Sequence, residues 1–376
     1  MTGARARFVV HVLPGLLLTV ACAIAARLLH GLLPPRPAAV LGEVVVAVLL
    51  GLVIGNAVML RPLFAPGIRF SFHSLLRVAI VILGAQFSFF QVVAIGGKAV
   101  LMIVILMALA LTVAHVLGRL TGVPGRLATL IGVGTAVCGN TAITATAPVI
   151  RAEDEEVSFA VATNTLFGTA AVFIYPVLGH WIGLSSAAFG TWAGTAVNDT
   201  SQVVATGFAY SDMAGKVATA VKLTRNALMG AVIVGIGLVY ARGEGGAHGW
   251  GDARGEPPAL GLPAALSSLG PRAAANWARL RQSIPGFVLG FLLAALLNTL
   301  GAIAWAGSIS GRDLSHDLQV ASRFLILVAL SGVGLSTRVS AMKRIGATPF
   351  LVGFATAATT ALASYLLIRW LGPAGG

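Results

Sequence analysis

Residues 194–207 read GTAVNDTSQVVATG and place five consecutive polar residues between two apolar stretches: Asn198, Asp199, Thr200, Ser201 and Gln202. The surrounding chain of 376 residues is 57% hydrophobic and 10% charged, and its mean hydropathy is +0.92. Soluble proteins do not have this composition. Apolar runs of about 20 residues, long enough to cross a ~30 Å hydrocarbon core, recur along the chain. The sequence therefore predicts an all-α, multi-pass membrane protein with a polar segment at its centre.

Apolar runs separated by Gly, Pro and charged residues predict eleven transmembrane helices. Loops rich in Lys and Arg alternate with loops poor in them, so that 15 of these residues fall on one side of the membrane and 7 on the other. By the positive-inside rule this alternation places the N-terminus in the cytoplasm and the acidic loop 153–156 outside. The net charge of +13 follows from these loops, so we expect no nucleic-acid partner. The predicted spans are 8–29, 39–60, 74–94, 98–118, 126–150, 157–180, 189–207, 215–241, 284–306, 319–336 and 348–370.

The spans predict a domain organisation of one extra helix and two inverted repeats of five helices. An N-terminal transmembrane helix fills residues 1–30, and its alternative is a cleaved signal peptide. The first repeat covers 39–180, and the second covers 181–241 together with 284–370. Residues 242–283 are rich in Gly and Pro and read as a flexible cytoplasmic linker.

Glycines interrupt two spans at corresponding positions of the two repeats, 126–150 and 319–336. Gly weakens a helix by ~1 kcal/mol relative to Ala, so both spans are candidate broken helices. The alternative is close packing of helices through small residues. The stretches GTAVCGNTAITAT (134–146) and GTAVNDTSQVVAT (194–206) also match at six of thirteen positions. With eleven spans both run in the same direction, so we interpret this match as coincidence.

Asp199 is the only acidic residue deep in a predicted span. An ionised carboxylate at mid-bilayer costs at least ~3 kcal/mol and needs a partner. Lys222, Arg225 and Asn226 follow in the next span at i, i+3 and i+4, on one helical face. Protonation of Asp199 would leave two cations free for an anion, and ionisation would make the carboxylate compete with that anion. The alternative is an ion pair between Asp199 and Arg225 that only fixes helix register.

Amide, hydroxyl and backbone groups near these charges are candidate ligands. The predicted substrate-binding residues are Lys222, Arg225, Asn226, Asn198, Thr200, Ser201, Gln202, Gly139, Asn140 and Thr141, with Asp199 as the ion-coupling residue. The chain has no HExxH motif, GxSxG motif or Walker loop. We therefore expect neither an enzyme nor a bound metal or cofactor, and the coupling ion is a proton in preference to sodium.

Four motifs carry a resemblance to a known family: GVGTAVCGNTAITATAPVIRAEDEEVSFAVATNTLFGT, WAGTAVNDTSQVVATG, VKLTRNALMG and SGVGLSTRVSAMKRIG. They resemble the bacterial sulfate exporter family of conserved inner-membrane proteins, over nearly the whole chain after the first span. This family is grouped with the bile-acid, arsenite and riboflavin carriers and with cation/proton antiporters. The resemblance implies a multi-pass protein of the bacterial inner membrane, with inverted five-helix repeats and broken crossing helices.

These observations together predict a secondary active transporter of a small anion, sulfate or a sulfonate, that exports it with proton coupling. Its partners are the anion and the lipid bilayer, and the implied fold is compatible with a homodimer. A passive anion channel and a sodium/proton antiporter are the alternatives. A membrane-embedded enzyme lacks its motifs here, and a structural subunit of a larger complex would require a stable partner.

Overall fold

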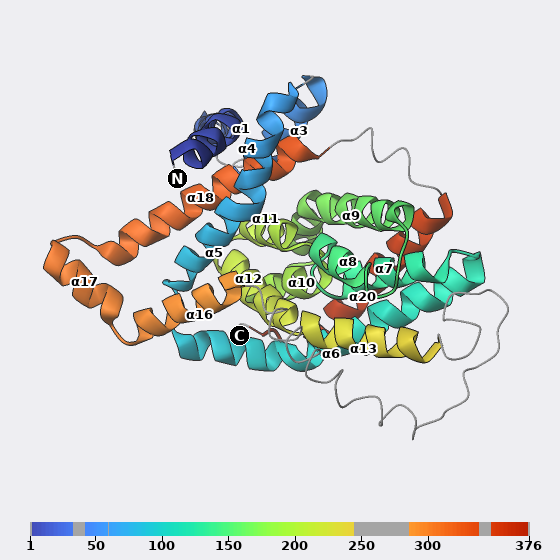
Figure 1. Ribbon diagram of the computed structural model, residues 1–376. Coiled ribbons are helices and arrows are strands. Elements are labelled where there is room, and N and C mark those ends of the chain that lie inside the picture. The colour runs from blue at the N-terminus through green and yellow to red at the C-terminus, as the bar shows by residue number, and fades with distance from the viewer. Residues whose placement is uncertain (1, 33–41, 59, 244–285, 338–346, 375–376) are drawn as a thin grey trace.

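The computed structural model describes residues 2–32, 42–58, 60–243, 286–337 and 347–374 (Figure 1). All regular secondary structure in these ranges is helical. The predicted all-α class is therefore confirmed. The predicted linker, apart from residues 242 and 243, lies outside the described residues.

The helices follow one another with short connections. In chain order they are α1 (Thr2–Leu32), α3 (Glu43–Ala57), η1 (Pro62–Phe64), α4 (Ala65–Phe70), η2 (Ser71–Leu75), α5 (Leu76–Gly84), α6 (Phe89–Thr121), α7 (Gly125–Ala136), α8 (Asn140–Thr146), α9 (Asp154–Trp181), α10 (Ser186–Ala196), α11 (Thr200–Tyr210), α12 (Asp212–Ala227), α13 (Met229–Gly243), α16 (Gly286–Thr299), α17 (Ala302–Ser310), α18 (Leu314–Ser336) and α20 (Ala347–Leu371).

Within the described residues, seven helical segments are long and apolar enough to cross a membrane. The α16–α17 pair, bent by 67°, makes an eighth if it is one span, and α3 is a shorter apolar helix. Neither α7–α8 nor α10–α11 is among these segments. The predicted count of eleven spans is therefore not confirmed.

Two predicted spans have the wrong bounds. Residues 62–84 form one helical run from η1 to α5, and residues 89–121 form one helix of 33 residues, in place of the predicted 74–94 and 98–118. The cause is a capping box, in which Ser88 accepts from the backbone of Gln91 and Gln91 accepts from the backbone of Ser88. This box starts a new helix at Phe89, inside the predicted span.

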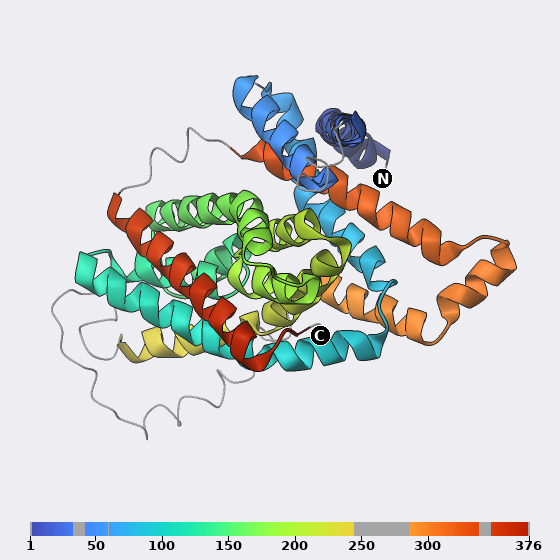
Figure 2. The same ribbon diagram turned by 180° about the vertical axis from the view of Figure 1, so that it is seen from behind.

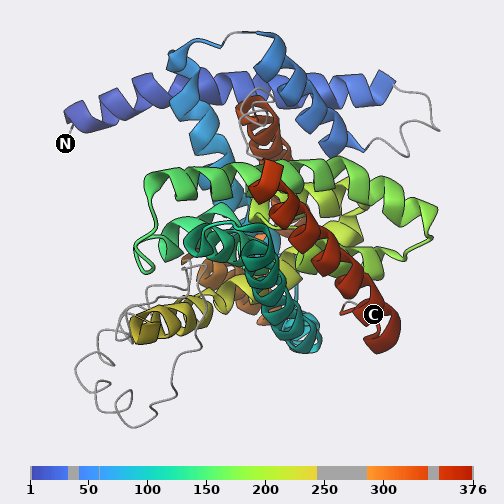
Figure 3. The ribbon, with the colours of Figure 1, turned by 90° about the vertical axis from the view of Figure 1, so that its right-hand side faces the viewer.

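The helices pack as two groups (Figures 1 and 3). The first group contains α1, α3, α4, α5, α16, α17 and α18, and the second contains α6 to α13 and α20. Figure 2 shows α20 lying across the second group. Buried apolar residues from both groups meet in one cluster, among them Val48 and Leu76 from the first and Val204 and Leu223 from the second. We call this the joint cluster.

Helices α7 and α8 form a hairpin that returns to the end where it began. A Cβ on Gly134 of α7 would lie 2.8 Å from Cδ1 of Ile143 on α8, so the two helices lie side by side. Tyr240 of α13 donates to the carbonyl of Gly125, where α7 begins, at 3.4 Å. One turn earlier on α13, a Cβ on Gly237 would lie 2.9 Å from Val149, just beyond α8. Both ends of the α7–α8 hairpin thus lie at one end of the bundle, which we call end A.

Helices α10 and α11 form a second hairpin, from the opposite end. The rings of Phe189 and Tyr210 stack with centroids 3.9 Å apart, and the Ser211 hydroxyl donates to the Ser186 hydroxyl at 2.9 Å. The start of α10 and the end of α11 are therefore neighbours, at what we call end B. Ends A and B are opposite, because the 28 residues of α9 separate the two hairpins and span about 42 Å at 1.5 Å per residue.

The match between 134–146 and 194–206 is therefore structural, and its interpretation as coincidence was wrong. That interpretation assumed that each stretch crosses the membrane. Each stretch instead contains the turn of a hairpin, and the hairpins enter from opposite ends, so α7 and α10 are inverted counterparts. The acidic segment 153–156, predicted at the end opposite Arg126, lies at the same end, since Glu156 and Arg126 are both within electrostatic reach of Tyr240, at end A.

The predicted break in 319–336 was wrong as well, because α18 is continuous from Leu314 to Ser336. Its glycines serve close packing, which was the alternative. A Cβ on Gly334 would lie 2.3 Å from the Val48 carbonyl oxygen of α3, and one on Gly51 would lie 2.5 Å from the Ser331 carbonyl oxygen. The predicted pair of five-helix repeats is not confirmed.

Candidate functional site

The turns of the two hairpins lie against each other. The α7–α8 turn is Val137-Cys138-Gly139, and the α10–α11 turn is Val197-Asn198-Asp199. Gly139 has φ +66°, and a Cβ there would lie 3.1 Å from the Asp199 Cα. Glycine is required at this position by both the left-handed backbone and the close approach. The site is therefore built from two non-helical turns in mutual contact.

Lys222 of α12 connects the two turns. Its side chain is fully buried, and Nζ donates to the carbonyls of Val137 at 2.7 Å and Val197 at 3.2 Å, and to that of Asn198. An ammonium group has three N–H donors, so all three can be satisfied by backbone oxygens.

Arg225, one turn further along α12, bonds to the same two helix ends. Nε donates to the carbonyl of Ala136 at 2.7 Å, and the terminal nitrogens donate to those of Thr195 at 2.8 Å, Val197 at 3.2 Å and Thr135. The carbonyl end of a helix carries partial negative charge and leaves its last C=O groups without helical partners. Lys222 and Arg225 thus satisfy and neutralise the C-terminal ends of α7 and α10.

Asp199 makes no ion pair with Lys222 or Arg225. Ion pairs do form elsewhere among the described residues, for example Arg27–Glu43 and Arg323–Asp212. Asp199 is half-buried and caps α11, where its Oδ1 accepts from the Ser201 amide at 2.9 Å and the Ser201 hydroxyl at 2.6 Å. The positive end of the helix dipole stabilises a carboxylate here. The Asp199–Arg225 ion pair, which was the alternative to a functional role for Asp199, is absent from this conformation.

Amide side chains surround the two turns. Asn226 donates to the Thr200 hydroxyl at 3.1 Å, and Gln202 donates to the Thr165 carbonyl at 3.2 Å. Asn164 of α9 donates to the Asn140 side-chain oxygen at 2.8 Å. Three of these buried amides have an oxygen without a hydrogen-bond partner: Asn164, Gln202 and Asn226.

The structure thus brings together residues from every part of the predicted site. Asn198, Ser201, Gln202 and Asn226 are buried, Thr200 and Asn140 are half-buried, and Thr141 is exposed. The sequence interpretation missed Asn164 and Thr165 of α9, although two consecutive amide and hydroxyl residues inside an apolar span are a usable signal. No group of three or more metal-ligating side chains occurs in the part of the chain that the structure describes.

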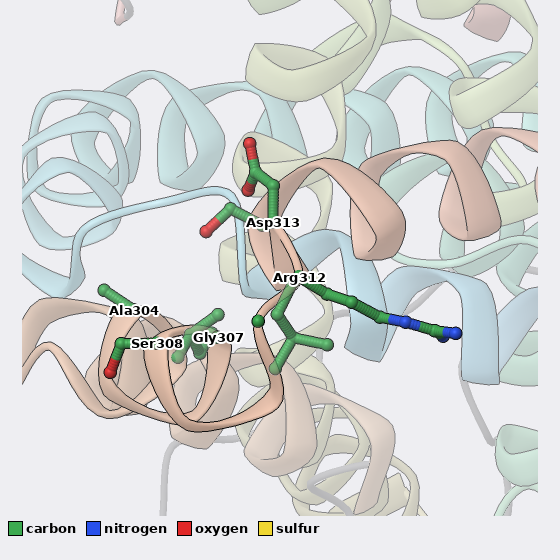
Figure 4. Close-up of a pocket in the computed structure, with 9 residues that line it drawn as sticks. Ala304, Gly307, Ser308, Arg312 and Asp313 are labelled. Carbon is green, nitrogen blue, oxygen red and sulfur yellow. The ribbon is translucent and has the colours of Figure 1, made fainter.

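A surface hollow of about 340 Å³ lies elsewhere, at the turn between α17 and α18 (Figure 4). Ala304, Gly307, Ser308, Arg312 and Asp313 contribute to its lining. None of its lining residues belongs to the hairpins, α9 or α12. The hollow is therefore separate from the site at the hairpin turns.

These features define a helical membrane protein whose polar site is formed where two hairpins meet. The chain belongs to the family described as Conserved hypothetical protein 698, whose model matches residues 14–255 and 265–353. It is 34% identical over 348 residues to a UPF0324 membrane protein of Streptococcus agalactiae serotype V, covering 91% of this chain and 92% of that one. A UPF0324 membrane protein of Clostridium tetani is 29% identical over 360 residues, covering 95% and 97%. Membership of a conserved family of membrane proteins, which the resemblance implied, is confirmed.

Proposed function

We propose that the protein is a secondary active transporter that exports a small anion, sulfate or a sulfonate, with proton coupling. The observation that carries this proposal is the meeting of two hairpin turns from opposite ends beside a single carboxylate, Asp199. Non-helical backbone at membrane depth is tolerated only inside protein or along a water-filled cavity. Secondary transporters use such interrupted helices to form substrate and ion sites.

Asp199 is the proposed proton site. As a carboxylate it occupies the positive end of α11, which is also the place that an anion would prefer. Protonation removes the negative charge and leaves the backbone and side-chain donors of this helix end available. Proton binding and anion binding at Asp199 therefore favour each other, and this is the linkage that a coupled transporter needs.

The remaining polar residues divide into ligands and supports. Asn140, Thr141, Thr200, Ser201 and Gln202 are the proposed ligands, with the backbone at Gly139 and Asn198. Since the donors of Lys222 and Arg225 point at backbone carbonyls, we assign these two cations to holding the turns in place. Asn226 holds Thr200. Direct contact of Lys222 or Arg225 with the anion would require their carbonyl bonds to break.

The arrangement in the membrane is also a proposal. End A carries Arg61, Arg119 and Arg126, which favours its placement in the cytoplasm, with the N-terminus on the same side. The eight candidate spans and α3 would cross the membrane nine times, and the two hairpins would enter it without crossing. This arrangement is consistent with that placement. We further propose that the protein lies in the bacterial inner membrane and that its activity is not enzymatic. A homodimer is compatible with this arrangement.

Sodium coupling is a second candidate. Three unpartnered amide oxygens, of Asn164, Gln202 and Asn226, lie around the turns. Hard cations bind oxygen ligands, and these oxygens accept no hydrogen bond in this structure. A sodium gradient would then drive flux where a proton gradient does not.

The test is radiolabelled sulfate flux in proteoliposomes under an imposed pH gradient, an imposed sodium gradient or neither. We expect the pH gradient to drive sulfate in the native protein and not in Asp199→Asn. Asp212→Asn is the matched control, because it removes a carboxylate at end B, away from the turns. Equal, gradient-independent flux in all three proteins would indicate a passive anion channel. Exchange of sodium for protons without sulfate flux would indicate a sodium/proton antiporter.

A further inference from the structure

Three basic side chains lie along one helical run of the first helix group. Arg69, His73 and Arg77 follow at intervals of four residues on α4, η2 and α5, and all three are exposed. We call them the basic stripe. Residues at this spacing share a helix face. His73 lies in η2, a single π-helical turn, and such turns occur frequently at functional sites.

The π-helical turn is anchored on its other side. The Ser71 hydroxyl bonds to the Gly67 carbonyl at 3.1 Å and to the Thr19 hydroxyl of α1 at 2.8 Å, and Ser71 and Thr19 are both fully buried. A Cβ on Gly332 of α18 would lie 3.2 Å from the Ser71 Cβ. Ser71 therefore faces α1 and α18, while His73, two residues on, remains exposed.

The joint cluster brings the helical run that carries His73 and the helix that Asp199 caps into one packed region, because Phe72 of η2 packs against this cluster. Leu76 of α5 and Val204 of α11 both belong to this cluster. In both α5 and α11 the chain runs toward end B. His73 therefore lies on the end A side of Leu76, and Asp199 lies on the end A side of Val204. Asp199, Arg69 and Arg77 all lie within electrostatic reach of His73.

The basic stripe also supplies positive charge that is free to face an anion, which the hairpins lack. The donors of Lys222 and Arg225 are directed at carbonyls, so the second group presents Asp199 without a free countercharge. Within the described residues, Arg77 contacts the Phe287 ring at 5.9 Å and no hydrogen bond or ion pair is found for Arg69. Gly332 of α18 packs on Ser71 of η2, and residues 324–336 around it contain no charged residue.

We propose that the basic stripe, centred on His73, is the second wall of the transport site and binds the anion from the side opposite Asp199. This inference rests on the proposed function and adds the source of positive charge. Protonated His73 donates to the anion, and Arg69 and Arg77 add positive charge on either side. Because His73 and Asp199 belong to different helix groups, the anion is bound only while the groups face each other across the site.

The first test is sulfate binding to the purified protein, measured by equilibrium dialysis with radiolabelled sulfate between about pH 5 and 8, where histidine changes its charge. We expect His73→Gln to weaken binding by about tenfold or more at low pH, as loss of a charge-assisted hydrogen bond would. His73→Arg should retain binding with less dependence on pH. Asp199→Asn should retain the pH dependence that belongs to His73. His316→Gln, an exposed histidine at end B, is the matched control.

The second test measures, without any ligand, whether residues 73 and 199 lie close together. In a background with Cys22→Ala and Cys138→Ala, His73→Cys combined with Asp199→Cys should crosslink with a short bis-maleimide in membranes, whereas His316→Cys combined with Asp199→Cys should not. Crosslinking with native sulfate binding in His73→Gln would overturn the stripe as an anion site and leave the transporter proposal intact. Absence of sulfate binding in the native protein would overturn both. Absence of the crosslink would overturn the placement of His73.

Discussion

The two hairpins share a backbone plan and differ in chemistry. In each, the sequence GTAV ends the first helix and leads into a turn of three residues, after which the chain returns beside that helix. Gly139 ends the first turn with a left-handed backbone and no side chain, whereas Asp199 ends the second with a carboxylate that caps α11. The backbone arrangement is repeated, and the carboxylate occurs in the second turn alone. The repeat provides two facing turns, and a single residue decides which of them carries a carboxylate.

The largest effect on stability is expected at Lys222, because both hairpin turns depend on this residue. Lys222→Met should lower the free energy of unfolding by about 3 kcal/mol or more, because buried carbonyls at both turns lose their donor. The measurement is thermal unfolding of the purified protein in detergent. Lys216→Met, on the same helix and half-buried, is the control. Similar melting of the two variants would show that the turns hold without Lys222.

The next largest effect on stability is expected at Gly139, the glycine of the first turn. Gly139→Ala should cost about 1–3 kcal/mol, since its φ is +66° and the new Cβ would lie 2.8 Å from the Asn164 side-chain nitrogen. Gly97→Ala on α6 is the matched control, because nothing lies within 4 Å of a Cβ there, and it should be neutral or slightly stabilising. Equal melting temperatures for the two variants would contradict the close approach of the turns.

The hairpins also differ in how the helix after each one is tied to the rest of the protein. Asp212, the first residue of α12, pairs with Arg323 of α18, whereas Asp154, the first residue of α9, forms no ion pair among the described residues. The pair is about half exposed, so Arg323→Ala should change stability by no more than about 1 kcal/mol. Chemical unfolding measures this change, and a larger loss would mean that the pair holds the two helix groups together.

The carboxylate of the second turn gives the smallest effect on stability. Asp199→Asn should change the free energy of unfolding by less than about 0.5 kcal/mol, because asparagine caps helices as well as aspartate and can accept from Ser201. The same variant should abolish proton-driven flux. Unfolding and flux measured on one preparation separate these two outcomes, and a loss of stability matching the loss of flux would make Asp199 a structural residue.

The sequence predicted several parts of the site correctly for local reasons. Consecutive polar residues around Asp199 stand out against an apolar chain, and a helical period of 3.6 places Lys222, Arg225 and Asn226 on one face. The sequence did not identify the targets of those cations. Their partners are backbone carbonyls, and every residue has a carbonyl, so no sequence pattern marks the ones that are bonded.

Composition by itself determined the class of protein, because a mean hydropathy of +0.92 is compatible only with burial in lipid. The direction of the chain after each turn was decided by the tertiary structure. An apolar stretch interrupted by VCG or VND can continue across the membrane or turn back, since the local hydrogen bonds of its two half-helices are the same in both cases. The choice depends on distant contacts such as Phe189 with Tyr210, Gly237 with Val149, and Lys222 with both turns. These contacts make the two similar stretches into opposed hairpins, and the site exists only where their turns meet.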